Sequence, residues 1–473
     1  MYSGSIGAIL VAVIVAYFCN NPLRHSRWFI VRRFLNWFPL GMTYAFLYTG
    51  RYNLAVAKTA LGSLMSNTDF GLIFAVGTGV YAFSFLINGP LVDRIGGKKG
   101  ILVAALGAAA ANVALGVVTY LVTHDRWHGS LVPTFCVIYG LNMYFQSYGA
   151  VSIIKVKAYW FHVRERGVFG AIFGTLISIG IYLAFDWGKW IVDTTGSVAM
   201  VFFVPAGVMV IWALIDLPAV QNTPEDAGFA PFDTHDASSG KMGETLTAGQ
   251  LLKRVFTSPV MLMISVVELS SGVFRQGVTQ WYPIFASQVK QPGAELFANH
   301  WGWFICMFGI IGSFAGGFVS DKLFQSRRGP PAALFCGVVL LFSLYMFGAI
   351  PSGPAEIGIC GVVIAMCAVG ITSLMSGTAA TDFGGRTATA TASGIVDGFA
   401  YLGSSLQSIA IGYITFAYGW KYWPLVLVPF AVLGLGIAIK IWFALPPATK
   451  RYLAEVEHKR VAAAAAGATL QSS

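Results

Sequence analysis

Charged residues are scarce in this chain. They make up 11% of its 473 residues, whereas hydrophobic residues make up 56% and the mean hydropathy is +0.70. Soluble globular domains carry about 25% charged residues, so the composition excludes an ordinary soluble protein. It predicts an all-α polytopic membrane protein.

Cysteine and histidine are also few. The six cysteines stand in apolar runs without CxxC spacing, and none of the seven histidines falls in the middle of a hydrophobic run. This pattern excludes a disulfide framework and gives no metal-ligand spacing. No nucleophile, base and oxyanion donors stand at plausible spacing either. We therefore expect no metal, no cofactor, no catalytic residue and no enzymatic activity.

Acidic residues are outnumbered by basic ones, 20 to 30, which gives a net charge of +10. Such an excess occurs in nucleic-acid-binding proteins and in membrane proteins with basic cytoplasmic loops. In a chain this apolar the second interpretation is favoured, so we reject nucleic acid as a partner. We expect a monomer whose partners are the bilayer and a small solute.

Long hydrophobic runs are abundant. Hydropathy predicts twelve spans of about 20 residues, six on each side of a linker rich in Pro, Gly, Ser, Thr and charge. We therefore divide the chain into an N-terminal apolar and basic segment, a first six-helix half, a cytoplasmic linker, a second six-helix half and a cytoplasmic tail, at 1–27, 28–217, 218–256, 257–445 and 446–473. Within the first segment, the apolar run 6–18 predicts either an additional helix or an interfacial anchor.

The basic residues gather in alternate loops. They stand before the first expected core helix, after the second, fourth and eighth, and in the tail, whereas the intervening loops are nearly free of them. Loops rich in Lys and Arg stay in the cytoplasm. The expected location is the inner membrane of a bacterium, with the linker and the C-terminus cytoplasmic.

One motif occurs in both halves. Gly89 and Asp93 are four residues apart in GPLVDRIGGKKG, with Arg94 directly after, and Gly317 and Asp321 are four apart in GGFVSDKLFQSRRG. The glycine would let a helix end approach its neighbour, and the aspartate would cap that end or pair with a nearby cation. Two such motifs at corresponding places resemble the signature of the major facilitator superfamily. That resemblance implies two six-helix halves around a central cavity.

Two arginines interrupt otherwise apolar spans. Arg51 lies in the first expected helix of one half and Arg275 in the first helix of the other, separated by nearly the same interval as the two motif glycines. A charge at bilayer depth costs roughly 3 kcal/mol on insertion scales. Paired guanidinium groups at equivalent positions would bind a dianion from both sides, although a structural ion pair is the alternative for each.

Further runs carry a narrower resemblance. They are YxxxYxxRxN at 44–53, FQSYG at 145–149, WFHVRERG at 160–167, RxGVxxWxP at 275–283, SDKLFQSRRG at 320–329 and TASGIVDGFAYLG at 391–403. In order and spacing they resemble the organophosphate:phosphate antiporter family, which includes the bacterial glycerol-3-phosphate and hexose-phosphate exchangers. The resemblance implies exchange of an organic phosphate for inorganic phosphate by a rocker-switch, with Arg51 and Arg275 holding the phosphate.

The chain also departs from that family. A second basic residue, a histidine, a tyrosine and two acidic residues of family members are replaced here by Tyr52, Ile177, Gly272, Cys306 and Gln280. The two arginines that the resemblance assigns to phosphate are kept in this chain. The residues that the family would use for the organic part of the substrate and for coupling are different.

Three more residues are candidates for the substrate site. Tyr44, Tyr48 and Arg51 share one helical face, so the phenols would donate to a substrate or pack at an interface. Lys155 would supply a third positive charge or extend to the headgroups.

Two acids accompany the arginines. Glu268 lies seven residues before Arg275, and Asp397 lies four residues before Tyr401, a further candidate substrate contact. Each acid would pair with an arginine when the site is empty, carry a proton, or form a permanent salt bridge.

We therefore predict a secondary transporter that exchanges an organic phosphate, similar to a sugar phosphate or glycerol phosphate, for inorganic phosphate. Two alternatives remain open. The first is a transporter-like sensor of a phosphorylated metabolite, and the second is a proton-coupled symporter of another organic anion.

Overall fold

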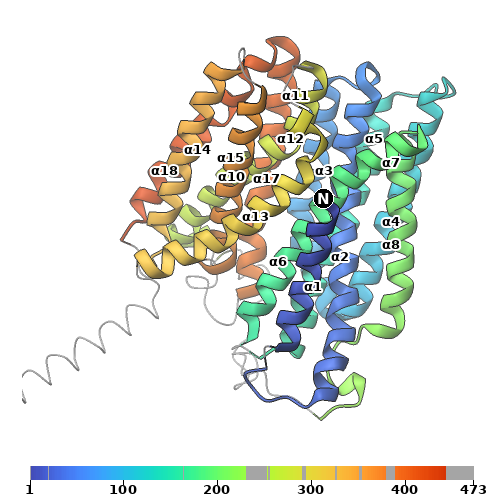
Figure 1. The fold of residues 1–473 in the computed structure, drawn as a ribbon, viewed down its shortest axis with the longest axis vertical. Helices are drawn as coiled ribbons and strands as arrows, with labels where there is room; N and C mark the ends of the chain where they lie inside the picture. Colours follow the sequence, from blue (N-terminus) through green and yellow to red (C-terminus); the bar gives the residue numbers. More distant parts are fainter. Residues whose placement is uncertain are drawn as a thin grey trace, which may run out of the picture.

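The structure is a computed structural model that describes residues 2–19, 21–162, 165–230, 253, 256–289, 295–324, 327–350, 354–379 and 389–443. The side chains of 2–3, 166–171, 321, 354, 377–379 and 389–393 lie outside that description. Every regular element of the described part is a helix, and most of these helices form two halves that stand side by side (Figure 1).

The first half contains the following helices: α2 (Arg27–Leu61), α3 (Asn67–Ile95), α4 (Gly97–Thr123), α5 (Leu131–Trp160), α6 (Arg166–Tyr182), α7 (Gly188–Thr195) and α8 (Met200–Ala219). A π-helical turn, Leu183–Trp187, joins α6 to α7, so the two form one continuous rod. Short 3-10 turns lie at Gly62–Leu64 and Glu225–Ala227.

The second half contains α10 (Pro259–Thr279), α11 (Trp281–Val289), α12 (Glu295–Asn299), α13 (Trp301–Phe318), α14 (Gly329–Ala349), α15 (Pro354–Thr372), α17 (Thr389–Ala417) and α18 (Val428–Lys440). Two π-helical turns, Val319–Leu323 and Ser373–Ala379, extend α13 and α15. A 3-10 segment, Trp420–Val426, precedes α18.

Length and hydropathy qualify eight helical stretches of the described residues to cross a membrane. Four further helices, α2, α5, α10 and α17, have 35, 30, 21 and 29 residues. At 1.5 Å per residue each is long enough for a hydrocarbon layer about 30 Å thick. With these four, the described part contains the twelve spans expected from the sequence. The four less apolar helices carry the candidate site residues, which explains their lower hydropathy.

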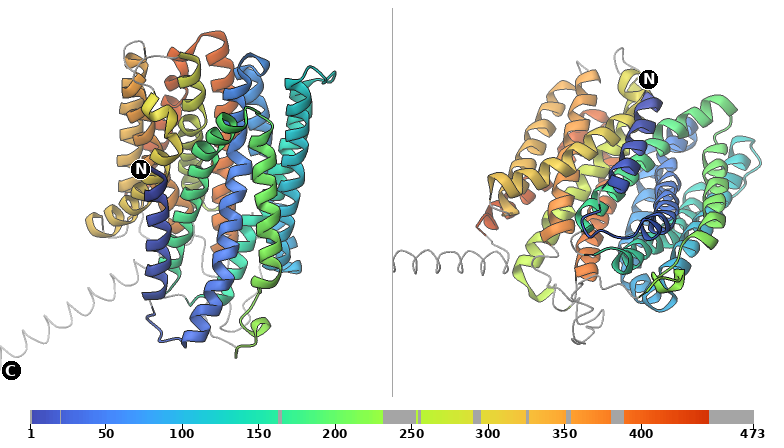
Figure 2. Two further views of the ribbon diagram at one scale, coloured as in Figure 1. Left: turned by 45° about the vertical axis from the view of Figure 1, so that its right-hand side comes forward. Right: turned by 60° about the horizontal axis from the view of Figure 1, so that its bottom comes forward.

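The N-terminal apolar run forms a helix, α1 (Tyr2–Cys19), that lies outside the two halves (Figure 2). It contacts α6, and near its start Ser5 accepts a 2.7 Å hydrogen bond from the indole of Trp303 in α13. Near its end, Tyr17 donates to the carbonyl of Ile30 in α2 at 2.9 Å. The additional helix therefore contacts both halves.

The halves are closed against each other at one end of the bundle. There α3 packs on α17 so tightly that a Cβ atom on Gly71 would lie 2.4 Å from the carbonyl oxygen of Ser408. Asn67 of α3 exchanges two amide hydrogen bonds with Gln288 of α11, at 2.9 and 3.3 Å. We call this the closed end.

A second contact at the closed end joins α13 to the rod of α6 and α7. The carboxylate of Asp186 accepts hydrogen bonds from the backbone N–H groups of Gly302 and Trp303, at 2.7 and 3.2 Å. An acidic group at a helix N-terminus satisfies free N–H donors and complements the helix dipole. Asp186 from one half thus caps a helix of the other.

The opposite end carries the basic loops, including Arg94, Lys98 and Lys99, and we call it the basic end. The motif glycines Gly89 and Gly317 lie there, and a Cβ atom on either would meet nothing within 4 Å. The expected close approach at these glycines is therefore wrong for this state, because contact between the halves is concentrated at the closed end.

A buried ion pair organises the basic end of the first half. Glu165, which precedes α6, accepts from Arg33 of α2 at 2.9 and 3.1 Å, and His25 lies 3.5 Å away. Arg33 also donates to Tyr17 of α1 at 3.0 Å. Burial alone would raise the pKa of Glu165, but hydrogen bonds from His25 and Arg33 and the charge of Arg33 lower that pKa to about 2.

The lowered pKa predicts a pH dependence of stability. Because an unfolded glutamate has a pKa near 4.5, the ion pair should contribute fully above about pH 4.5 and lose its contribution as the pH falls toward 2. The shift corresponds to roughly 3 kcal/mol. We expect Glu165→Gln to lose about this much free energy of unfolding at pH 7. In this variant the free energy of unfolding should also fall less steeply between pH 4.5 and 2. The exposed Glu225→Gln is the control, and equal losses in both variants would contradict the account.

Candidate functional site

Arg51 is the 25th of the 35 residues of α2, and 0% of its surface is exposed. Its guanidinium donates three hydrogen bonds, from Nε to the amide oxygen of Gln146 at 3.0 Å, from Nη1 to the hydroxyl of Tyr401 at 2.6 Å, and from Nη2 to that of Tyr81 at 3.1 Å. Gln146 and Tyr81 belong to the first half and Tyr401 to the second. The hydrogen bonds of the Arg51 guanidinium therefore join the two halves.

Aromatic faces surround the same guanidinium. Its carbon lies 4.4 Å from the ring centroid of Tyr48, 4.5 Å from that of Tyr81 and 5.7 Å from that of Tyr401. Cation–π contacts of this kind stabilise a desolvated cation by up to about 2 kcal/mol each. The three tyrosine rings form an aromatic cage, which offsets part of the free-energy cost of burying the charge. The cage itself contains no carboxylate.

Arg275 lies in α10, and its guanidinium carbon is 5.9 Å from the ring centroid of Tyr401. The ring of Tyr401 is thus shared by the two arginines that the sequence singled out. Three ion pairs within 4.0 Å occur among the described residues, and neither arginine takes part in any of them. In the described part of the chain, neither guanidinium forms a salt bridge within 4.0 Å with a carboxylate.

The residues that directly follow the arginines also meet. The amide of Gln276 donates to the hydroxyl of Tyr52 at 2.9 Å, which joins α10 to α2. Tyr52 is the residue that replaces a basic side chain of the resembled family. Its hydroxyl forms a contact between the halves where that family has a charge.

Two glycines explain why Tyr401 lies so close to Arg275. A Cβ atom on Gly272 would lie 1.9 Å from the carbonyl oxygen of Ala400, and one on Gly403 would lie 2.1 Å from that of Leu269. Helices α10 and α17 are therefore in backbone contact, which only glycine permits at these positions. A tyrosine at 272, as in the family, could not fit this packing.

Tyr44 and Tyr48 extend the aromatic surface along α2. Their ring centroids lie 5.4 Å apart at an interplanar angle of 82°, and both side chains are buried. Tyr48 touches the guanidinium of Arg51, whereas Tyr44 lies one turn further toward the basic end. The structure thus brings Tyr48, Arg51, Arg275 and Tyr401 together, with Tyr44 at the edge of the group.

The structure places Lys155 apart from the arginines. Its ammonium group forms a 2.7 Å ion pair with Asp93, the aspartate of the first loop motif. Lys155 is 28% exposed and Asp93 65% exposed, so the pair is solvated and contributes little stability. The sequence predicted a partner for the motif aspartate across the short loop between α3 and α4, whereas the cation that pairs with Asp93 comes from α5. Arg94 follows as an exposed residue, and the side chain of Asp321 lies outside the described part.

Glu268 is fully buried in α10, with Asp397, Arg275 and Thr372 as its electrostatic neighbours. Asp397 faces both Arg275 and Arg51 from α17. Neither acid comes within 4.0 Å of an arginine among the described ion pairs. The two carboxyl groups therefore border the arginines without a salt bridge to them in this state.

Several polar atoms of α10 and its end are buried without a hydrogen bond to any described residue. They include Nε of Arg275, Oε1 of Gln276, Oγ1 of Thr279 and both amide atoms of Gln280. Buried polar groups in proteins are nearly always paired, with protein, water or ligand. This group of atoms marks the α10 side of the interface as a place suited to a polar solute.

Sequence reasoning missed four residues of the site: Tyr81, Gln146, Tyr52 and Gln276. Gln146 stands within FQSYG, and Tyr52 and Gln276 each follow an arginine, so their positions carried a signal that was not used. The position of Tyr81 carried no such signal, because Tyr81 lies within an apolar span. Only the packing of the helices brings its hydroxyl to Arg51.

The shared tyrosine gives a testable expectation. Tyr401→Phe removes the hydroxyl that accepts from Arg51 and leaves a buried N–H without its partner, which costs about 1 to 3 kcal/mol. The ring still faces Arg275. We expect a lower free energy of unfolding in detergent, measured against Tyr413→Phe, an exposed tyrosine of the same helix. An equal, small effect of both changes would show that the hydroxyl does not stabilise the buried charge.

Comparisons with known proteins bear on this site. The glycerol-3-phosphate transporter of Bacillus subtilis (strain 168) is 26% identical over 421 residues, which cover 84% of this chain and 90% of that protein. The membrane sensor protein UhpC of Escherichia coli (strain K12) is 24% identical, with 90% and 96% covered. A probable hexose phosphate transport protein of Chlamydia pneumoniae is 23% identical, with 85% and 89% covered.

A solved structure has the same fold. It is the crystal structure of a bacterial homolog to the human lysosomal transporter Spinster, in an inward-facing and unoccupied conformation. It superposes with a TM-score of 0.66 at 15% identity, and the match covers 91% of this chain and 98% of that one. The expected twelve-helix architecture of two six-helix halves is thereby confirmed.

A family model described as Major Facilitator Superfamily matches residues 40–408, from α2 to α17, and so includes both arginines and both loop motifs. The narrower resemblance noted in the sequence is confirmed by the phosphate-related relatives. This chain is a multi-pass membrane protein that belongs to the Major Facilitator Superfamily.

Proposed function

We propose that this protein exchanges an organic phosphate for inorganic phosphate across a membrane by alternating access. The organic substrate is a small anion similar to a sugar phosphate or glycerol phosphate. Its relatives include transporters named for glycerol-3-phosphate and for hexose phosphate. The relatives supply the substrate class, and the two arginines supply the physical reason for it.

The observation that carries the proposal is the convergence of Arg51 and Arg275 on Tyr401. Each arginine comes from the first helix of one half, and neither is neutralised by a carboxylate within 4.0 Å among the described residues. Planar guanidinium groups match phosphate oxygens in a bidentate way. A phosphate dianion between them would balance both charges.

The substrate would replace bonds that the site now makes within the protein. Phosphate oxygens would accept from Arg51 in place of the hydroxyl of Tyr401, and that hydroxyl would be free to donate to the phosphate. The buried polar atoms of Arg275, Gln276 and Gln280 would bind the remaining oxygens or the organic part. Tyr44 and Tyr48 would line the approach.

Reorientation requires contacts at the closed end to break. The amide pair of Asn67 and Gln288 and the cap of Asp186 on α13 both join the halves there. Bound phosphate would draw the two arginines together and compensate for the loss of these contacts, so the halves would rock about the site. Without an anion, two like charges would face each other during closure at the basic end. Closure at the basic end is thus favoured with a bound anion and opposed without one. For this reason the exchange is obligatory.

The loop motifs would act at the basic end. Gly89 and Gly317 have free space in the present state, and they would allow close helix contact once the halves meet there. Lys155, held by Asp93, belongs to this region and would guide anions toward the arginines. We assign Glu268 and Asp397 to the empty state, as neighbours that partly balance Arg275.

We place the protein in the inner membrane of a bacterium, with the basic end, the linker and the C-terminus in the cytoplasm. The basis is the gathering of Lys and Arg at one end of the bundle. In this orientation the present structure is closed to the outside.

Transport in proteoliposomes tests the proposal. We expect labelled phosphate to enter vesicles preloaded with phosphate and not empty ones, and one organic phosphate to compete. Arg51→Lys and Arg275→Lys should each lower the exchange rate by about tenfold or more, because lysine keeps the charge and loses the planar fork. Arg27→Lys, an exposed arginine at the start of α2, is the matched control.

Two outcomes would overturn the proposal in favour of other functions. Phosphate binding that depends on the arginines but gives no flux would indicate a sensor, as the relative named UhpC is. Uptake driven by a pH gradient in vesicles without internal phosphate would indicate a proton-coupled symporter. In the second case Glu268→Gln and Asp397→Asn should abolish the pH dependence.

A further inference from the structure

A groove on the outer surface of the first half combines one cationic side chain with several exposed aliphatic side chains. It lies between α2 and α8 near the basic end and has a volume of about 660 Å³. Leu35 lines it from α2, and Ile211, Leu214 and Ile215 line it from α8, all four with side chains 39% to 61% exposed. The only charged side chain among its lining residues is Arg32.

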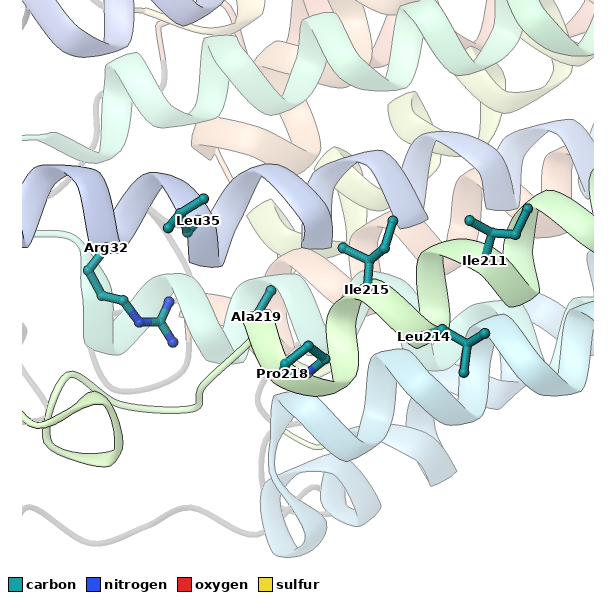
Figure 3. Close-up of a pocket in the computed structure, with 7 residues that line it drawn as sticks. All are labelled: Arg32, Leu35, Ile211, Leu214, Ile215, Pro218 and Ala219. Atoms are coloured by element: carbon teal, nitrogen blue, oxygen red, sulfur yellow. The ribbon is translucent and has the colours of Figure 1, made fainter.

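Arg32 stands at one end of this groove, and its guanidinium is directed toward Pro218 and Ala219 (Figure 3). The aliphatic side chains follow along α8, away from the arginine (Figure 3). The guanidinium carbon lies 5.7 Å from the ring centroid of the buried Trp160, which holds the arginine in place. The cation is therefore followed along the groove by a row of exposed aliphatic side chains.

One nitrogen of this guanidinium is buried and unpaired. Nη1 of Arg32 forms no hydrogen bond with any residue that the structure describes, and the described ion pairs do not include Arg32. The adjacent Arg33, in contrast, has its charge balanced by Glu165. A half-buried cation with a buried, unpaired donor fits an anionic group from outside the protein.

The depth of Arg32 identifies the source of that anion. Helix α8 has 20 residues and a length of about 30 Å, which matches the hydrocarbon layer. Its last residues, Pro218 and Ala219, therefore lie at the boundary with the headgroups, and Arg32 lies beside them. Trp28, one turn earlier on the same face of α2, is 80% exposed, as expected of an aromatic anchor at headgroup depth.

We propose that this groove is a binding site for one anionic phospholipid. The lipid phosphate binds Arg32, and one acyl chain lies in the channel formed by Leu35, Ile211, Leu214 and Ile215. All lining residues belong to α2 and α8, which pack together within the first half. The site therefore keeps its shape when the halves rock, so the lipid stabilises the first half and does not gate transport.

Retention of lipid by the purified full-length chain tests this site. The protein is reconstituted in vesicles of phosphatidylcholine with 25% palmitoyl-oleoyl phosphatidylglycerol and extracted in mild detergent, and bound phosphatidylglycerol is counted by native mass spectrometry. We expect about one retained molecule per chain. Arg32→Gln should weaken retention by about tenfold, as for a lost charge-assisted hydrogen bond. Arg27→Gln, exposed and outside the groove, should leave retention unchanged.

A second variant tests the apolar part of the groove and keeps the proposal testable if Arg32→Gln fails to fold. Ile215→Trp fills the channel and should weaken retention of the palmitoyl-oleoyl lipid while leaving binding of dihexanoyl phosphatidylglycerol within twofold. Three results would overturn the proposal: equal losses in Arg27→Gln and Arg32→Gln, retention unaffected by either groove variant, or displacement of the lipid by millimolar inorganic phosphate. The last result would identify a site for a free anion.

Discussion

The positive charge of Arg51 inside the membrane is the constraint on which the rest of the structure depends. No described carboxylate lies within 4.0 Å of it, and three hydrogen bonds and three aromatic faces hold it instead. Phenols and rings stabilise a guanidinium without cancelling its charge, so the site keeps a net attraction for anions. A salt bridge would have stabilised the helix more simply and would have had to break for each substrate. The arrangement thus favours binding of a dianion over permanent neutralisation.

The same constraint explains how the halves are joined. Tyr401, from the second half, completes the cage of the arginine in the first, and the glycine contacts of α10 with α17 bring its ring to Arg275 as well. The direct bond between Gln276 and Tyr52 lies beside it. Contacts at the site and contacts at the closed end therefore both stabilise the present conformation. A substrate that rearranges the bonds of Tyr401 acts on the link between the halves.

Much of this could be predicted from the sequence. Scarce charge indicated a membrane protein, and the repeated Gly and Asp motif indicated two equivalent halves. Arg51 and Arg275 are separated by nearly the same interval as the motif glycines, so both were expected in equivalent helices. What remained hidden depends on rotation of helices about their axes. The hydroxyl of Tyr81 reaches Arg51 only because α3 turns that face inward, and Lys155 meets Asp93 because two helix ends are adjacent. The state of the motif glycines could not be predicted either, because their contacts depend on which end of the bundle is closed.

The most direct test of the account is a double-mutant cycle on phosphate binding. Equilibrium affinity for inorganic phosphate would be measured by isothermal titration calorimetry on the purified wild type, Arg51→Lys, Arg275→Lys and the double variant. If one phosphate is held by both guanidinium groups, either single change should remove most of the affinity, and the double variant should bind little more weakly than the single ones. Independent losses that add up fully, or an affinity unaffected by one of the two changes, would contradict the claim that both arginines bind the same anion.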